Sequence, residues 1–201
     1  MIRAIAAFLL VAVSSVALAQ APANPPVRIR GTVEKIDGNM LTVKARNGQS
    51  MTVKLADNYT VMGVAKASVS DVSSGKFIGT TTVGERDGNL IAEEIHIFPE
   101  NMRGTGEGHY DWDLRPNSKM TNANVANISS MGKDRVMTVQ YKGGEKKILV
   151  PENAVVVAFE PTDKSELKPG AQIFSVAQKQ PDGSLTAARV NIGLKGQVPP
   201  M

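Results

Sequence analysis

The segment Asp87–Ile97, DGNLIAEEIHI, recurs 95 residues further along the chain as Asp182–Ile192, DGSLTAARVNI. The Asp-Gly pair that opens each copy is typical of a tight hairpin turn, because glycine adopts a positive φ without strain. The residues after the turn alternate between apolar and polar, which predicts a half-buried strand in each copy. The spacing of Ala92 and Ile95 indicates a bulge between them.

The repeat extends well beyond this hairpin. Residues Asp57–Phe98 align without a gap with Glu152–Gly193, and ten of the 42 positions are identical. Turn signals and alternation predict five or six short strands in each copy, with a short helical turn before the last hairpin. We therefore expect an all-β fold of two tandem small barrels resembling the oligonucleotide/oligosaccharide-binding (OB) barrel. A sandwich has the same alternation and stays open as an alternative.

The N-terminus has the pattern of a cleaved signal peptide. Arg3 precedes the apolar run Ala4–Val13, and Ala17-Leu18-Ala19 is a small-x-small cleavage pattern. This predicts export to the periplasm. No cysteine follows the run, so we expect no lipid anchor and no disulfide. There is no second apolar run, so we expect no membrane span.

These patterns together give a predicted domain organisation. The expected boundaries are a signal peptide at 1–19, a disordered stretch at 20–26, a barrel repeat at 27–98, an inter-repeat segment at 99–120, a second barrel repeat at 121–194 and a C-terminal tail at 195–201.

Charge and motifs argue against two broad functions. Without Arg3, 22 Lys and Arg face 19 Asp and Glu, a mild excess that forms no basic stripe, and aromatic residues are few. We therefore expect no nucleic-acid binding. The chain has no cysteine nucleophile, no G-x-S-x-G elbow and no H-E-x-x-H helix, so we predict that it is not an enzyme.

The inter-repeat segment Pro99–Met120 has no counterpart in the rest of the repeat and contains the only tryptophan. Exposed aromatic side chains are costly, so we expect the segment to pack against a barrel, either as a structural clasp or as a binding surface. The binding candidates in it are Arg103, His109, Tyr110, Trp112 and Arg115.

The same segment allows two more specific hypotheses. Glu107, His109, Asp111 and Asp113 alternate, so an extended chain places them on one side as candidate ligands of a divalent metal; otherwise no cofactor is expected. His96 is a further candidate ligand, although alternation places it on the outer face of its strand, exposed or at the interface between the barrels. Alternatively, Tyr110 and Trp112 stack on a sugar whose hydroxyls the neighbouring carboxylates bind.

The pattern GTVEKIDGNMLTVKARNGQSMTV at Gly31–Val53, with the later D-V-x-x-G and D-G-x-L-x-A-x-x-I at Asp71–Ile95, resembles a family of bacterial exported domains of unknown function. The resemblance implies small β-barrels, often in tandem, and its motifs are mainly turn and core positions. The sequence thus predicts an exported, non-enzymatic binding or interaction protein, whose partner is an unknown protein or a ligand of the cell envelope.

Overall fold

The turns that the repeat predicts are present in the computed structural model, which describes residues 25–201. Asp87 and Gly88 both have positive φ, 53° and 75°, and join β4 (Phe77–Arg86) to β5 (Asn89–Ile97). The strand pairing skips one residue of β5, between the pairs made by Ala92 and Glu94, which confirms the predicted bulge. The predicted signal peptide at 1–19, and residues 20–24 of the stretch predicted to be disordered, lie outside the described residues.

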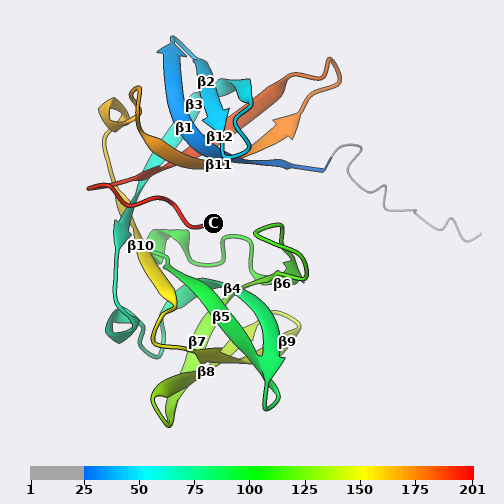
Figure 1. Cartoon of the computed structure of the whole chain (residues 1–201), viewed down its shortest axis with the longest axis vertical. Coiled ribbons are helices and arrows are strands. Elements are labelled where there is room, and N and C mark those ends of the chain that lie inside the picture. The colour runs from blue at the N-terminus through cyan, green and yellow to red at the C-terminus, as the bar shows by residue number, and fades with distance from the viewer. Residues whose placement is uncertain (1–24) are drawn as a thin grey trace, which may run out of the picture.

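The fold is all-β, as predicted, and five strands close into a first barrel (Figure 1). Their pairing order is β1-β2-β3-β12-β11 and back to β1, with β3 and β12 parallel and every other pair antiparallel. The strands are β1 (Val27–Asp37), β2 (Met40–Ala45), β3 (Ser50–Lys66), β11 (Gln172–Lys179) and β12 (Leu185–Gly193).

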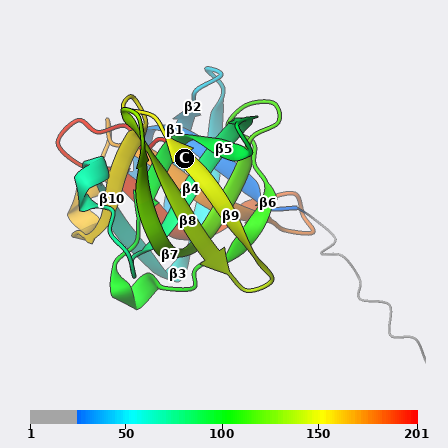
Figure 2. The same ribbon diagram turned by 90° about the horizontal axis from the view of Figure 1, so that it is seen from below.

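The equivalent pairings form a second ring, β7-β8-β9-β5-β4 and back to β7, again with one parallel pair, β5 and β9. Figure 2 shows this barrel from below, in front of the first. Its remaining strands are β7 (Lys119–Met131), β8 (Asp134–Tyr141) and β9 (Gly144–Val150).

The strand pairings differ from the expected tandem arrangement, because the two repeats exchange their last hairpins. The β4–β5 hairpin, which lies in the predicted domain 27–98, pairs with β7 and β9 of the other repeat. The β11–β12 hairpin, from the predicted domain 121–194, pairs with β1 and β3. Each barrel therefore contains strands of both repeats.

The physical reason for the exchange is the length of β3. This strand continues for 17 residues without a turn, about 55 Å at the usual rise per residue, so it leaves the first barrel and delivers the next hairpin to the second. Strand β10 (Val155–Pro161) crosses in the opposite sense, antiparallel to the end of β3 and parallel to β5. Repeats with similar edges accept either hairpin, as in domain swapping.

Among residues 25–201, three separate groups of buried apolar side chains hold the fold together. The interiors of the two barrels are almost wholly aliphatic, with Val, Ile, Leu, Ala and Met. The third group lies between the barrels and is largely aromatic; it comprises Val64, Phe77, Phe98, Met102, Val157, Phe159, Phe174 and Met201, with Met62 and Trp112 at its edge. This third core fixes one barrel against the other.

The remaining elements include short helices and the C-terminal tail. Residues 25–201 contain three short 3-10 helices, η1 (Val69–Asp71), η2 (Glu100–Met102) and η3 (Lys164–Glu166), of which η2 contributes Met102 to the third core. The C-terminal tail folds back, since a Cβ at Gly193 would lie 1.7 Å from the Gln197 carbonyl oxygen. Arg46 donates to the carbonyl of Pro199 at 2.8 Å and Arg30 donates to that of Met201, so the tail ends between the barrels (Figure 1).

Candidate functional site

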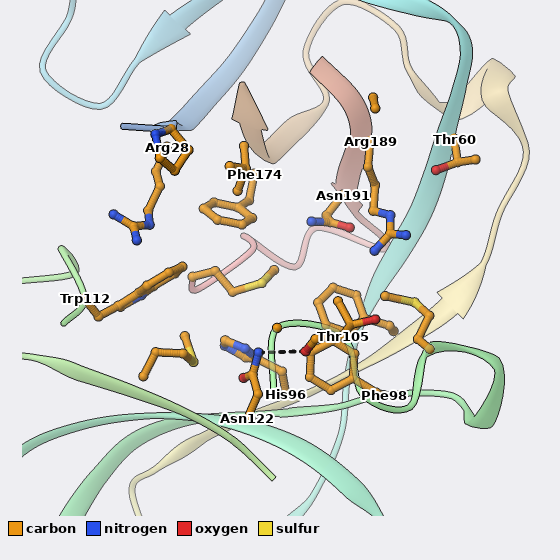
Figure 3. A pocket seen from close by; sticks show the side chains of 18 of the residues that line it. Arg28, Thr60, His96, Phe98, Thr105, Trp112, Asn122, Phe174, Arg189 and Asn191 are labelled. Carbon is orange, nitrogen blue, oxygen red and sulfur yellow. Dashed lines mark hydrogen bonds between the residues drawn. The ribbon is translucent and has the colours of Figure 1, made fainter. Parts of the chain in front are cut away.

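A pocket of about 480 Å³ lies between the two barrels, beside the third core (Figure 3). We call it the inter-barrel pocket. Its aromatic and methionine wall is formed by Phe98, Met102, Tyr110, Trp112, Met120, Phe159, Phe174 and Met201. Its polar wall is formed by Arg28, Thr60, His96, Thr105, Asn122, Arg189 and Asn191. Ligand sites commonly have this composition, an apolar surface with a few polar groups that fix orientation.

The repeat explains why the pocket lies where it does. His96 on β5 and Asn191 on β12 occupy the same position of the two repeats, and alternation turns both away from their barrel interiors. Both line the pocket, and both are buried. The pocket therefore forms where the equivalent outer faces of the two barrels meet, and of the two positions expected for His96, exposed or at the barrel interface, the structure has the interface.

Polar atoms without partners concentrate in this pocket. Within residues 25–201, five buried side-chain nitrogen or oxygen atoms have no hydrogen-bond partner. Four of the five belong to residues that line the pocket, namely His96 Nε2, Trp112 Nε1, Asn122 Oδ1 and Asn191 Oδ1. Buried polar groups in folded proteins are nearly always paired, so a cluster of exceptions beside a cavity marks a place where a ligand or ordered water completes the hydrogen bonds.

The His96 side chain is held against a buried carboxylate. His96 Nε2 lies 3.3 Å from Glu94 Oε1, outside good hydrogen-bond geometry, and the Thr81 hydroxyl donates to the same oxygen at 2.6 Å. Burial raises the pKa of Glu94, but His96, Thr81 and Arg30 together outweigh it and hold this pKa below its ordinary value. Glu94 is therefore a buried anion behind the wall of the pocket.

Strand β6 (Gly108–Asp111) brings the inter-repeat segment to the pocket by pairing antiparallel with β7. Alternation along β6 turns Tyr110 to the pocket, where the Asn122 amide donates to its hydroxyl at 3.3 Å. Burial raises the pKa of Tyr110, although the nearby Arg28 opposes this. Asn122 also donates to the Thr105 carbonyl at 3.1 Å, which leaves its Oδ1 as a free acceptor (Figure 3).

Trp112 joins the segment to the first barrel. The guanidinium of Arg28 lies 4.1 Å from the centre of the indole ring, and the ring of Phe174 lies 6.3 Å away. The Ser118 hydroxyl donates to the Trp112 carbonyl at 2.9 Å, which holds the loop that follows β6. The segment thus bridges the barrels as the clasp hypothesis expects, and the same residue lines the pocket.

The four candidate metal ligands have separate partners. The Glu107 carboxylate accepts from the Lys142 backbone at 3.0 Å, and His109 Nδ1 lies 2.8 Å from the Thr121 hydroxyl. Asp111 pairs with Lys119, and Asp113 lies 2.7 Å from Arg30 and 3.6 Å from Arg28. In the described part of the chain, no three His, Asp or Glu side chains are grouped so as to hold a metal ion.

Charges around these ligands also affect their pKa values. Burial, then the nearby Lys146 and Lys119, lowers the pKa of His109, which favours the neutral imidazole. The hydrogen bond from Lys119 lowers the pKa of Asp111. For Asp113, burial raises the pKa, but Arg30 and Arg28 outweigh it and lower the pKa overall. The two aspartates are therefore anions neutralised by basic neighbours.

The five predicted binding residues divide between the pocket and the surface. Tyr110 and Trp112 line the pocket, whereas the ring of His109 stacks near Tyr141 on the other face of β6. Arg103 bonds Glu100 at 2.6 Å and the Gly75 carbonyl at 2.9 Å, and Arg115 pairs with Glu93. These two arginines attach the segment to the second barrel.

The sequence reasoning missed most of the polar wall. Arg28, Asn122, Arg189 and Asn191 were not predicted as site residues, because polar residues on the outer face of a strand look like solvent-exposed positions. One signal was available. Asn191 and His96 stand at the same repeat position between apolar neighbours, so the alignment could have placed both at a shared interface.

Comparisons of the chain with protein-family models, with curated proteins and with solved structures found no match. The resemblance of the repeats to an exported domain family therefore stays a prediction. No helix among the described residues has the length and apolar character needed to cross a membrane.

Proposed function

We propose that this protein is a non-enzymatic binding protein that holds a small, largely apolar organic molecule in the inter-barrel pocket. The observation that carries the proposal is that four residues lining this pocket have a buried polar atom without a hydrogen-bond partner among residues 25–201, and that three of these atoms, Trp112 Nε1, Asn122 Oδ1 and Asn191 Oδ1, make no ion pair there either. An unpaired buried polar atom costs about 1–3 kcal/mol, so a ligand that pairs with these atoms recovers free energy on binding. The pocket volume lies in the range of small-molecule sites.

The lining favours an apolar ligand over a sugar. Tyr110 and Trp112 meet edge to face, with ring planes at 65°, and so do not present one flat stacking platform. Asp111 and Asp113, which would accept sugar hydroxyls, are paired with Lys119 and Arg30. By contrast, Phe98, with Phe159 beside it, faces Phe174 across the pocket, which provides aromatic surface on both sides of a ligand.

A metal-binding role has less support than organic ligand binding. The carboxylates of the candidate set each have a basic or backbone partner, so a cation would compete with those contacts. It would also have to bring Asp113, which lies in the loop after β6 and is held by Arg30 of the first barrel, to the candidate ligands at β6.

Two further features belong to the same proposal. We propose that the protein is exported and works in the periplasm, on the strength of the pattern at residues 1–19. We also propose that each barrel is OB-like. Five strands in the order β1-β2-β3-β12-β11, and a 3-10 helix between the third strand and the last hairpin of each repeat, support this assignment.

Fluorescence of Trp112, the only tryptophan, tests the proposal directly, because this ring lines the pocket. The panel contains decanamide, 4-phenylbutyrate, oligosaccharides and divalent metals. We expect saturable changes with the apolar molecules. Ala188→Phe, which places a ring in the exposed wall of the pocket, should abolish them, whereas Ala126→Phe on the exposed surface of β7 should not.

A response to sugars or metals alone would replace the proposal with one of its alternatives. Apolar binding that survives Ala188→Phe unchanged would place the ligand elsewhere and would contradict the proposed site.

A further inference from the structure

The pocket wall is unbalanced in charge. Its lining includes two arginines, Arg28 and Arg189, and no aspartate or glutamate among the described residues. A cavity lined by charge of one sign attracts the opposite sign. The ligand that fits this wall therefore carries a negative group.

The two arginines are not equivalent. Arg28 lies over the Trp112 ring and within 3.6 Å of Asp113, so the Asp113 carboxylate already neutralises part of its charge. The side chain of Arg189 makes no ion pair or hydrogen bond with any other residue that the structure describes. An arginine presents several donors in a planar fork, which matches a carboxylate with two parallel hydrogen bonds.

Arg189 stands beside one of the unpartnered residues. Alternation along β12 puts Arg189 and Asn191 on the same outer face, and Figure 3 shows both side chains extending toward the cavity. The side chain of Asn191 makes no hydrogen bond with a described residue, and it is buried. Guanidinium and amide thus form one polar end of the pocket.

The repeat shows that this polar end is specific to one half of the molecule. Arg189 aligns with Glu94, 95 residues earlier on β5. Glu94 is buried beneath the surface with Thr81 and His96, so the acidic member of the pair makes its contacts inside the fold. The basic member is left facing the cavity.

The rest of the cavity suits an apolar body. The rings of Phe98 and Phe159 lie 5.0 Å apart, and Phe174 and Trp112 lie 6.3 Å apart on the opposite wall. Figure 3 places Phe174 and Phe98 on opposite sides of the cavity, with Trp112 away from Arg189. The pocket therefore has a cationic end and an aromatic body.

We propose that the ligand is an amphipathic carboxylic acid. Its carboxylate pairs with the Arg189 guanidinium and the Asn191 amide, and its chain or ring lies between Phe98 and Phe174. Trp112 Nε1 and Asn122 Oδ1 take a further hydrogen-bonding group of the body. This inference rests on the proposed function and adds the chemical class of the ligand.

Titration calorimetry with decanoate, decanamide and decylamine tests the ligand class, since these probes share one chain and differ in the charge of the head. The wild-type chain should bind decanoate about tenfold or more tightly than decanamide, because hydrogen bonds to a charged group are the stronger ones. Arg189→Gln should reduce decanoate affinity to that of decanamide and leave decanamide unchanged. Lys133→Gln, in the exposed turn between β7 and β8, is the charge-matched control and should change neither.

The outcomes separate this inference from the function on which it rests. Binding of none of the three probes would overturn the proposed function and the inference with it. Equal affinity for decanoate and decanamide, or tighter binding of decylamine, would overturn the carboxylate while leaving the pocket as a binding site. An equal loss for acid and amide in Arg189→Gln would show that Arg189 acts by packing, against the inference.

Discussion

The interior of each barrel and the space between the barrels are built differently. The barrel interiors are aliphatic and tightly closed, whereas the space between them is aromatic, contains a cavity and gathers four unpartnered polar atoms. An interface made only for stability would pair or remove those atoms. This contrast supports our proposal that the barrels are the scaffold and that the space between them binds the ligand.

The largest expected effect concerns which strands build each barrel. Thr32 on β1 and Gln172 on β11 are paired residues of different repeats, and the Gln172 amide donates to Thr32 at 2.9 Å. In this cysteine-free chain, Thr32→Cys with Gln172→Cys should form a disulfide within the monomer in nearly every molecule, because paired strand residues lie within disulfide reach. Non-reducing electrophoresis with mass measurement checks this.

The matched control uses Phe77 in place of Gln172. Phe77 is the residue that aligns with Gln172 in the first repeat, the repeat that also contains Thr32. Thr32→Cys with Phe77→Cys should stay reduced, since Phe77 pairs with Asn124 of the second barrel. A disulfide in this pair, or only intermolecular disulfides in the first pair, would show that the hairpins are not exchanged within one chain.

A smaller effect is expected from a substitution in the barrel interior. Ile192 is buried in the first core, so Ile192→Ala should lower the free energy of unfolding by about 2–5 kcal/mol through lost burial and a residual cavity. Guanidinium denaturation measures the change. A cost below about 1 kcal/mol would mean that this interior is loosely packed, against the scaffold role.

The adjacent residue on the same strand gives the opposite expectation. Asn191 is buried with an unpartnered Oδ1, so Asn191→Leu should raise the free energy of unfolding by about 1 kcal/mol while weakening ligand binding. Asn122→Leu is the contrast, since Asn122 also loses two hydrogen bonds and should destabilise the fold. If Asn191→Leu destabilises the fold and keeps full ligand affinity, the polar wall has a structural role. The contrast between the barrel interiors and the pocket would then not reflect ligand binding.

The smallest effect is a pH dependence behind the pocket wall. The pKa of Glu94 is lowered in the folded state, so its contribution to stability is present above the unfolded carboxyl pKa, about 4.3, and is lost as pH falls through the folded value. Glu94→Gln should therefore lose less stability than the wild type between about pH 5 and pH 3. Thermal melts across this range provide the measurement, and parallel curves for the two proteins would assign the acid sensitivity to other carboxylates.

Local patterns in the sequence predicted the elements well. The Asp87-Gly88 turn, the bulge after Ala92 and the inward positions of Ile95 and Ile97 all follow from turn chemistry and alternation. The exchange of hairpins could not be predicted, because alternation fixes which face of a strand is buried and not which repeat provides its neighbour.

The site was only partly predictable for a related reason. Tyr110 and Trp112 stood out as aromatic residues in a segment outside the repeat, and both line the pocket. His109 and Asp111 do alternate along β6 as predicted. Their neighbours on β7, Thr121 and Lys119, bind them separately. Arg189 and Asn191 gain significance only when the second barrel faces them, which depends on tertiary contacts between distant strands.

A crystal structure of the protein soaked with decanoate would show whether the space between the barrels binds a ligand. We expect density between Phe98 and Phe174, with the carboxylate within hydrogen-bond distance of Arg189. Density for the ligand at any other place, with the side chains of the inter-barrel pocket unchanged, would contradict the claim.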